Sequence, residues 1–149
     1  MSYLVTSVTL ALLAAISLID WRRRIIPNRL LLAFAAVALF DIAFLVLSGS
    51  SWQDLILDRL LGSVLIATPL FALTLWRPVS FGMGDVKLVA AAGFSLGTAG
   101  NCVAFAIACL LGSFYGLILL FRRRGRKATF AFGPALCFGI GLVNVWSLL

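Results

Sequence analysis

Histidine and glutamate are both absent from the 149-residue sequence, and charged residues of any kind make up only 11% of it. Without histidine, the commonest general base and the commonest metal ligand are missing. The three cysteines, Cys102, Cys109 and Cys137, lie in apolar runs and form no C-x-x-C pair, which argues against a thiolate zinc site. Any catalysis must therefore use Asp, Lys, Cys, Ser or Tyr, and no metal site or cofactor is predicted.

Apolar residues are in excess, at 63% of the sequence, and the mean hydropathy is +1.15. A soluble domain is typically about 45–50% apolar and about 25% charged. Intrinsic disorder requires low hydrophobicity and high net charge, the opposite of this composition. The composition therefore predicts an all-α, polytopic membrane protein that forms a single domain over residues 1–149.

The lengths of the apolar runs predict six membrane-spanning helices. The run 88–121 carries no formal charge, and as one helix it would extend about 51 Å, too long for a hydrocarbon core of about 30 Å. It must fold back once, and Gly97–Asn101 is the turn we expect. Trp52–Asp58 is expected at the outer interface, with Asp54 and Asp58 in an outer loop. The predicted spans are residues 3–19, 30–47, 60–76, 86–96 with flanking residues, 102–121 and 128–149.

Basic residues set the predicted orientation. The 12 Lys and Arg residues outnumber the five acids and give a net charge of +7. In the six-span arrangement, every cation except Arg59 falls on one side of the membrane, which the positive-inside rule makes the cytoplasmic side. These cations are Arg22, Arg23, Arg24, Arg29, Arg77, Lys87, Arg122, Arg123, Arg124, Arg126 and Lys127. Both termini are then outside. Nucleic-acid binding is not expected, because no binding motif or aromatic-laced basic surface is present.

Two pairs of glycines have the spacing that permits close contact between membrane helices. Gly93 and Gly97 form one G-x-x-x-G pattern, and Gly112 and Gly116 form another. Such pairs let helix backbones approach where no hydrophobic force drives association. Chance occurrence in a glycine-containing membrane chain is an equal alternative for each pair.

Aspartates in membrane helices are costly, so each one requires an explanation. Asp20 closes the first span and Asp85 opens the fourth, so the topology places both at the cytoplasmic face. Two neighbouring carboxyl groups do not both ionise easily, and such a pair can activate water and protonate a leaving amine. The positive end of a helix dipole favours Asp85 as the base and leaves Asp20 as the acid. Capping or pairing with arginine is the alternative for each. Asp41, within the second span, is expected to be structural, paired with Arg59 or placed at the outer interface.

Three motifs accompany these acids. Asp20 is followed by an arginine run and then Ile26-Pro27-Asn28; Asp85 ends a G-x-G-D motif that continues Val-Lys-Leu; and Phe132-Gly133-Pro134 stands near the end. Taken in order, they resemble the bacterial prepilin peptidases, the type IV leader peptidases of the G-x-G-D intramembrane aspartyl class. The resemblance covers about residues 16 to 139.

The resemblance implies a role for each motif residue. Asp20 and Asp85 match the two catalytic aspartates, and Gly82 and Gly84 match the motif glycines. Lys87 matches a basic position of the motif, although a charge that only sets topology is an alternative. The remaining motif residues, expected near the site as structural positions, are Pro27, Asn28, Gly133 and Pro134.

The resemblance also implies a function. The chain looks like the short, peptidase-only members, such as those that serve tight-adherence pili, because it lacks an N-terminal C-x-x-C region linked to N-methylation. The implied activity is removal of a short leader from prepilin or pilin-like proteins at the cytoplasmic face of the bacterial inner membrane. Two alternatives stay open, a non-catalytic subunit of a pilus or secretion assembly and a small proton-coupled transporter. The sequence does not predict the oligomeric state.

Overall fold

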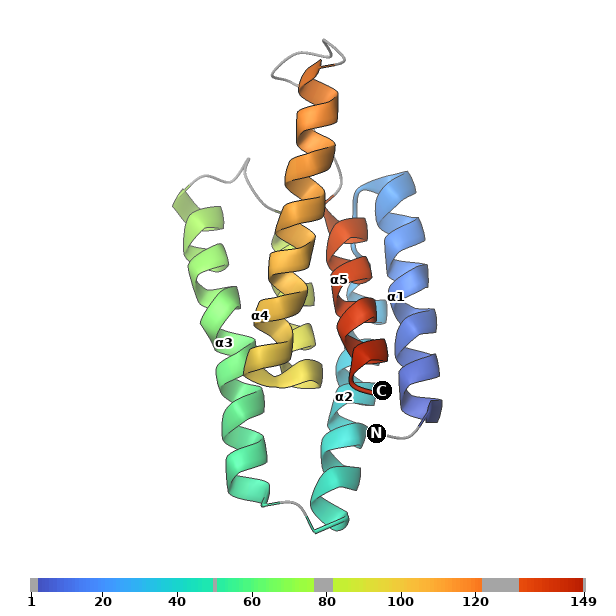
Figure 1. The fold of residues 1–149 in the computed structure, drawn as a ribbon, viewed down its shortest axis with the longest axis vertical. Coiled ribbons are helices and arrows are strands. Elements are labelled where there is room, and N and C mark those ends of the chain that lie inside the picture. Colours follow the sequence, from blue (N-terminus) through green and yellow to red (C-terminus); the bar gives the residue numbers. More distant parts are fainter. Residues whose placement is uncertain (1–2, 50, 77–81, 122–131, 149) are drawn as a thin grey trace.

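The computed structural model describes residues 3–49, 51–76, 82–121 and 132–148. In this part of the chain it contains five helices and no strands: α1 (Tyr3–Arg23), α2 (Asn28–Leu47), α3 (Trp52–Trp76), α4 (Met83–Phe121) and α5 (Gly133–Trp146). The helices form one bundle with their axes along its length (Figure 1). The predicted all-α class is confirmed.

Helix α4 is broken at Gly97, where φ is 75° and ψ is −175°. A first limb runs down the bundle and a second limb runs back up beside it (Figure 1). The side-chain amide of Asn101 ties the limbs together by donating to the carbonyl oxygen of Val89 at 3.2 Å and to that of Gly62, in α3, at 2.8 Å. The predicted fold-back is therefore present, but only Gly97 leaves the helical conformation, and Asn101 already belongs to the second limb.

Close backbone contact joins this break to α3. A Cβ on Gly93 would collide with the backbone of Gly62, and a Cβ on Gly62 would lie 2.7 Å from the backbone nitrogen of Thr98. The first G-x-x-x-G pair is thus a helix contact, as glycine spacing in membranes predicts. Among the described residues, no atom lies within 4 Å of the corresponding position on Gly116, so no helix contact is seen there for the second pair.

The other differences from the sequence prediction concern helix ends. Trp52–Asp58 is the start of α3 rather than a loop, because Ser51 and the first-turn Asp54 favour a helix start there. Its position at the outer interface stays a prediction. Helix α1 continues to Arg23 and ends where Arg24 adopts a φ of 53°. Helix α5 is shorter than the predicted sixth span.

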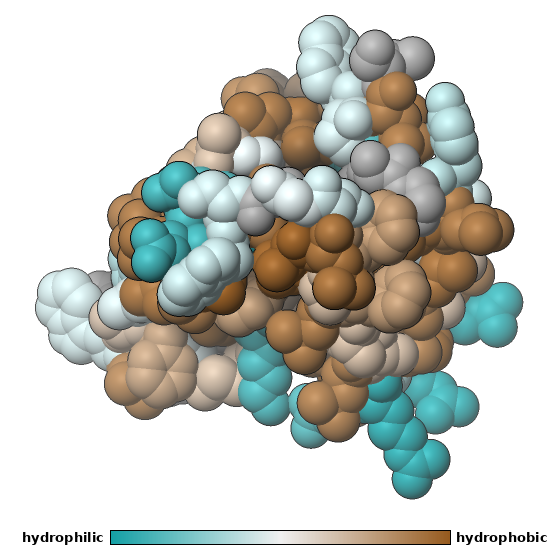
Figure 2. Space-filling view, turned by 90° about the horizontal axis from the view of Figure 1, so that it is seen from below, coloured by the Kyte–Doolittle hydropathy of each residue, from teal (hydrophilic) through white to brown (hydrophobic). Residues whose placement is uncertain are grey.

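In the described part of the chain, four helices are long and apolar enough to cross a membrane, namely α1, α2, α3 and α4, whereas α5 is an apolar helix of only 14 residues. Large apolar side chains are exposed along the bundle, among them Leu32, Leu65, Leu110 and Phe138. Figure 2 shows hydrophobic residues over most of the visible surface. A membrane protein is therefore indicated, whereas six spans and the outside position of both termini stay predictions. Arg77 and the basic run 122–127 lie outside the described residues.

Candidate active site

Asp20 lies in the last turn of α1 and is 5% exposed. The helix ends just beyond it, with the backbone N–H of Arg24 donating to the carbonyl oxygen of Asp20 at 2.8 Å. The backbone of Gly133 forms a hydrogen bond with the Asp20 carboxyl group. Its Oδ2 atom is nonetheless buried without a hydrogen-bond partner. An unsatisfied buried carboxyl oxygen is costly, so a functional explanation is favoured.

Asp85 lies in the first turn of α4 and is half-buried. Gly82 forms the turn that starts this helix: its carbonyl oxygen accepts the backbone N–H of Asp85 at 3.0 Å, and its own backbone forms a hydrogen bond with the Asp85 carboxyl group. A Cβ on Gly82 would lie 3.3 Å from Oδ2 of Asp85, tighter than ordinary contact. The first motif glycine therefore leaves room for the carboxyl group that it holds.

The two acids meet at one end of the bundle. The carboxyl groups of Asp20 and Asp85 interact electrostatically, and both also interact with the buried thiol of Cys137 in α5. One acid stands at a helix C-terminus and the other at a helix N-terminus, so the helix dipoles favour the anion on Asp85. The predicted juxtaposition of the two acids is therefore present in the structure.

The Ile-Pro-Asn segment packs against the G-x-G-D segment. A Cβ on Gly84 would lie 3.0 Å from Cβ of Ile26, which leaves no space for a larger residue. The Lys87 ammonium group donates to Oδ1 of Asn28 at 3.2 Å. Pro27 precedes the first residue of α2 and directs the chain into that helix with φ −68° and ψ 127°. These contacts fix the start of α4, and with it Asp85, against the start of α2.

The Phe-Gly-Pro segment holds Asp20 from the opposite side. Gly133 begins α5, and Pro134 occupies its first turn, where the missing N–H of proline is tolerated. A Cβ on Gly133 would lie 2.8 Å from Cγ of Asp20 and closer still to Oδ2. Only glycine at this position lets α5 approach the carboxyl group so closely. Of the motif residues predicted from the sequence, Gly82 contacts Asp85 and Gly133 contacts Asp20, whereas Gly84, Lys87 and Asn28 contribute to the packing of α4 on the start of α2.

The remaining acids lie elsewhere in the bundle. Asp41 is 2% exposed in α2 and interacts electrostatically with Arg59, but Oδ1 of Asp41 and Nε of Arg59 are both buried without a hydrogen-bond partner in the described part of the chain. The direct pairing of the two side chains therefore stays a prediction. Asp58 has a role that the sequence analysis missed, since its carboxylate accepts the backbone N–H of Thr98 at 3.1 Å and its backbone carbonyl accepts the Thr98 hydroxyl at 2.9 Å. It thereby caps the second limb of α4. In the sequence, the polar Thr98 directly after Gly97 was the feature that could have indicated a capped helix start.

Two carboxyl groups that interact electrostatically suit acid–base chemistry on a water molecule. One carboxylate can take a proton while a neighbouring carboxylic acid gives one. Among the described residues, no group of three or more His, Cys, Asp or Glu side chains is arranged to hold a metal ion. The site is thus a carboxyl pair at the end of a helical membrane bundle.

Comparison with known proteins agrees with this class of site. The type IV leader peptidase family matches residues 7–117, a stretch that contains both acids and the Ile-Pro-Asn and G-x-G-D motifs. The chain therefore belongs to the type IV leader peptidase family, and the resemblance seen in the sequence is confirmed.

A similar protein is the prepilin leader peptidase/N-methyltransferase of Bacillus subtilis (strain 168). It is 31% identical over 133 residues, which cover 89% of this chain and 51% of the relative. The chain thus spans about half the length of this curated relative. No solved structure gives a significant match.

Proposed function

We propose that this protein is an intramembrane aspartyl endopeptidase that removes the short leader from prepilin or pilin-like proteins. The observation that carries the proposal is the meeting of Asp20 and Asp85 at one end of the bundle, each held by a motif glycine. Family membership supports cleavage of a peptide bond as the reaction, and the carboxyl pair supports acid–base catalysis as its mechanism. We propose no cofactor and no metal, and the partners are prepilin substrates and the lipid bilayer.

In the proposed mechanism, Asp85 is the base and Asp20 is the acid. The Asp85 carboxylate takes a proton from water while the water oxygen bonds to the carbonyl carbon of the scissile peptide. Asp20 then gives its proton to the amide nitrogen, and the carbon–nitrogen bond breaks to release the leader and a new amino terminus. After the reaction Asp85 carries the proton and Asp20 is the anion. Proton exchange with water then restores the starting state. The pair works as one unit, so the two assignments describe one coupled site.

The proposed location is the cytoplasmic face of the bacterial inner membrane. At the end of the bundle that carries the acids lie Arg22, Arg23 and Arg24 after Asp20, Arg29 at the start of α2, and Lys87 at the start of α4. The positive-inside rule favours the cytoplasm for this end. The start of α1 and the end of α5 lie toward the other end of the bundle (Figure 1), which supports six spans with the termini outside.

The test is co-expression with pilin-like precursors encoded near the gene, with leader loss read as a mass shift. The protein is expected to shorten one or more of them, whereas Asp85→Asn, at equal protein level, should leave them intact. If Asp85→Asn supported normal pilus assembly and no precursor were shortened by either protein, a non-catalytic assembly subunit would replace the peptidase.

A further inference from the structure

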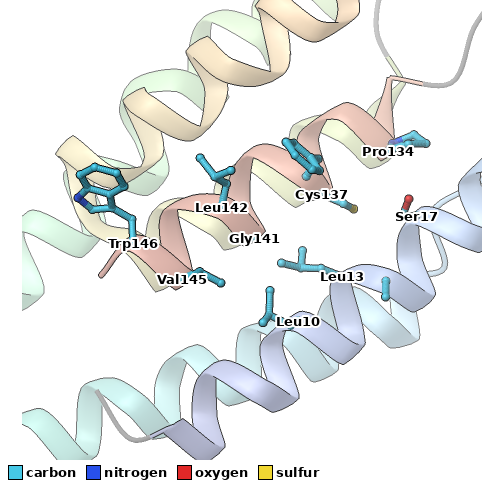
Figure 3. Close-up of a pocket in the computed structure, with 11 residues that line it drawn as sticks. Leu10, Leu13, Ser17, Pro134, Cys137, Gly141, Leu142, Val145 and Trp146 are labelled. Atoms are coloured by element: carbon cyan, nitrogen blue, oxygen red, sulfur yellow. The ribbon is translucent and has the colours of Figure 1, made fainter. Parts of the chain in front are cut away.

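A groove of about 660 Å³ runs between α1 and α5 on the outside of the bundle (Figure 3). Leu10 and Leu13 point into it from α1, and Cys137 points into it from α5 (Figure 3). Its lining is almost entirely apolar. The full lining consists of Leu10, Leu13, Ala14, Ser17, Pro134, Cys137, Phe138, Gly141, Leu142, Val145 and Trp146.

One end of the groove meets the candidate active site. Ser17 lies one helical turn before Asp20, and Pro134 directly follows the Gly133 that contacts Asp20. Cys137, in the groove lining, interacts electrostatically with both Asp20 and Asp85. A chain that lies in the groove therefore has one end beside the segment of α5 that contacts Asp20.

The dimensions and lining suit a helix. The groove follows α5 from Pro134 to Trp146, which is about 18 Å at about 1.5 Å per residue, or about three helical turns. Ala14, Ser17 and Gly141 are small, and small residues are what let a second helix approach closely in a membrane. Ala14 and Phe138 are exposed, so a helix that diffuses in the bilayer reaches the groove from the side.

We propose that this groove binds the first turns of the apolar helix of the prepilin substrate, with the leader junction at Asp20 and Asp85. This inference rests on the proposed function and adds the place where the substrate binds. The arginines that follow Asp20 offer no attraction to a basic leader, so the affinity must come from the apolar helix. Continuity with the carboxyl pair favours the substrate helix over a lipid chain or a second copy of the protein, neither of which presents a peptide bond there.

Site-directed disulfide crosslinking tests the groove independently of cleavage. The enzyme carries Asp85→Asn, has its three cysteines replaced by alanine, and receives Ala14→Cys in the groove. The probe is a single-pass peptide with a short basic leader, an apolar helix of about 20 residues and one cysteine in the second turn of that helix. A disulfide needs Cβ atoms about 3.5–4.5 Å apart, so only a seated helix is captured efficiently.

Ala36→Cys is the matched control. Ala36 is exposed on α2, outside the groove, and lies about 12 Å along its helix from Asn28, against about 9 Å between Ala14 and Asp20. The crosslinking yield is expected to be at least about tenfold higher at Ala14→Cys than at Ala36→Cys, which corresponds to a free-energy difference of about 1.4 kcal/mol between the two positions. Equal yields, or no crosslink at either position, would overturn the proposal. Crosslinking at Ala14→Cys between two enzyme copies would assign the groove to self-association instead.

A second variant measures the consequence for turnover. Ala14→Trp, with Asp20 and Asp85 intact, should lower processing of a helix-containing precursor by about tenfold or more, mainly through KM, whereas Ala36→Trp should stay within about twofold. Unchanged processing by Ala14→Trp would contradict the groove and leave the peptidase assignment standing. If the unsubstituted protein processed no precursor but the crosslink at Ala14→Cys still formed, the proposed function would be contradicted instead.

Discussion

Replacing Gly133 by alanine should inactivate the proposed peptidase without unfolding it. The added Cβ would lie 2.8 Å from Cγ of Asp20, and ordinary van der Waals contact begins at 3.4 Å. Gly133 is the first residue of α5, and Pro134 fixes the backbone beside it, so the helix start has little freedom to retreat. The Asp20 carboxyl group must therefore move away from Gly133 and lose its hydrogen bond with the Gly133 backbone.

The size of the effect follows from that displacement. Cγ must move by about 0.6 Å to reach ordinary contact, and Oδ2, which would lie closer to the added Cβ, must move farther. Misplacing a catalytic group by about 1 Å costs on the order of 100-fold in rate, or about 2.7 kcal/mol of activation free energy. The assay is the initial rate of precursor shortening in membranes, normalised to the protein level. Far-UV circular dichroism of the purified variant checks that the helices are retained.

Gly116→Ala is the control for this substitution. No atom lies within 4 Å of the position of the added Cβ, so the change only replaces one helical residue by a better helix former, worth about 1 kcal/mol at most. Its processing rate should equal that of the unsubstituted protein. A wild-type rate for Gly133→Ala would refute the reasoning, because it would mean that Asp20 is not held where the reaction requires it.

Three further predictions concern the surroundings of the site. Lys87→Met removes the hydrogen bond to Asn28 and should slow processing by about 2–10-fold. Lys87→Gln should retain more activity, because its amide can still donate to Asn28. Equal rates for both variants and the unsubstituted protein would mean that Lys87 serves only to set the membrane topology. Chelators, and replacement of Cys102 and Cys109 by alanine, should leave cleavage largely intact, whereas loss on chelation that zinc restores would contradict an aspartyl mechanism. Cysteines introduced at Arg24 and Ser51 should react with membrane-impermeant reagents from the cytoplasmic and outer sides respectively, and the reverse pattern would overturn the orientation.

The fold could be predicted from the sequence where a single length or charge decides the outcome. The uncharged run 88–121 is too long for one span, so it must fold back, and the turn residues Gly97–Asn101 place the break. Helix ends were less predictable. Asp54 and Asp58 were expected in an outer loop, but Asp54 lies in the first turn of α3 and Asp58, also in α3, caps the second limb of α4. Whether a charged residue belongs to a loop or to a helix end can be decided only once its hydrogen-bond partner is known.

The candidate site, like the fold, could be predicted only in part. Asp20 and Asp85 could be predicted to share one face, because each stands at a helix end on the same side. The reason for each motif glycine could not be predicted, since Gly133 contacts Asp20 and Gly84 contacts Ile26 only once the helices have packed. The groove between α1 and α5 is likewise a property of packing, to which helices far apart in the sequence contribute.

The central claim is that Asp20 and Asp85 act as one catalytic unit, and the most direct measurement compares precursor processing by Asp20→Asn, by Asp85→Asn and by the double variant. Asparagine keeps the shape of the side chain but carries no exchangeable carboxyl proton and no negative charge, so each single variant should lose processing by several orders of magnitude. The double variant should be no worse than either, because the pair fails when one member is lost. Asp41→Asn, outside the pair, should keep most activity. Normal processing by Asp20→Asn or by Asp85→Asn, or losses that multiply in the double variant, would contradict the account.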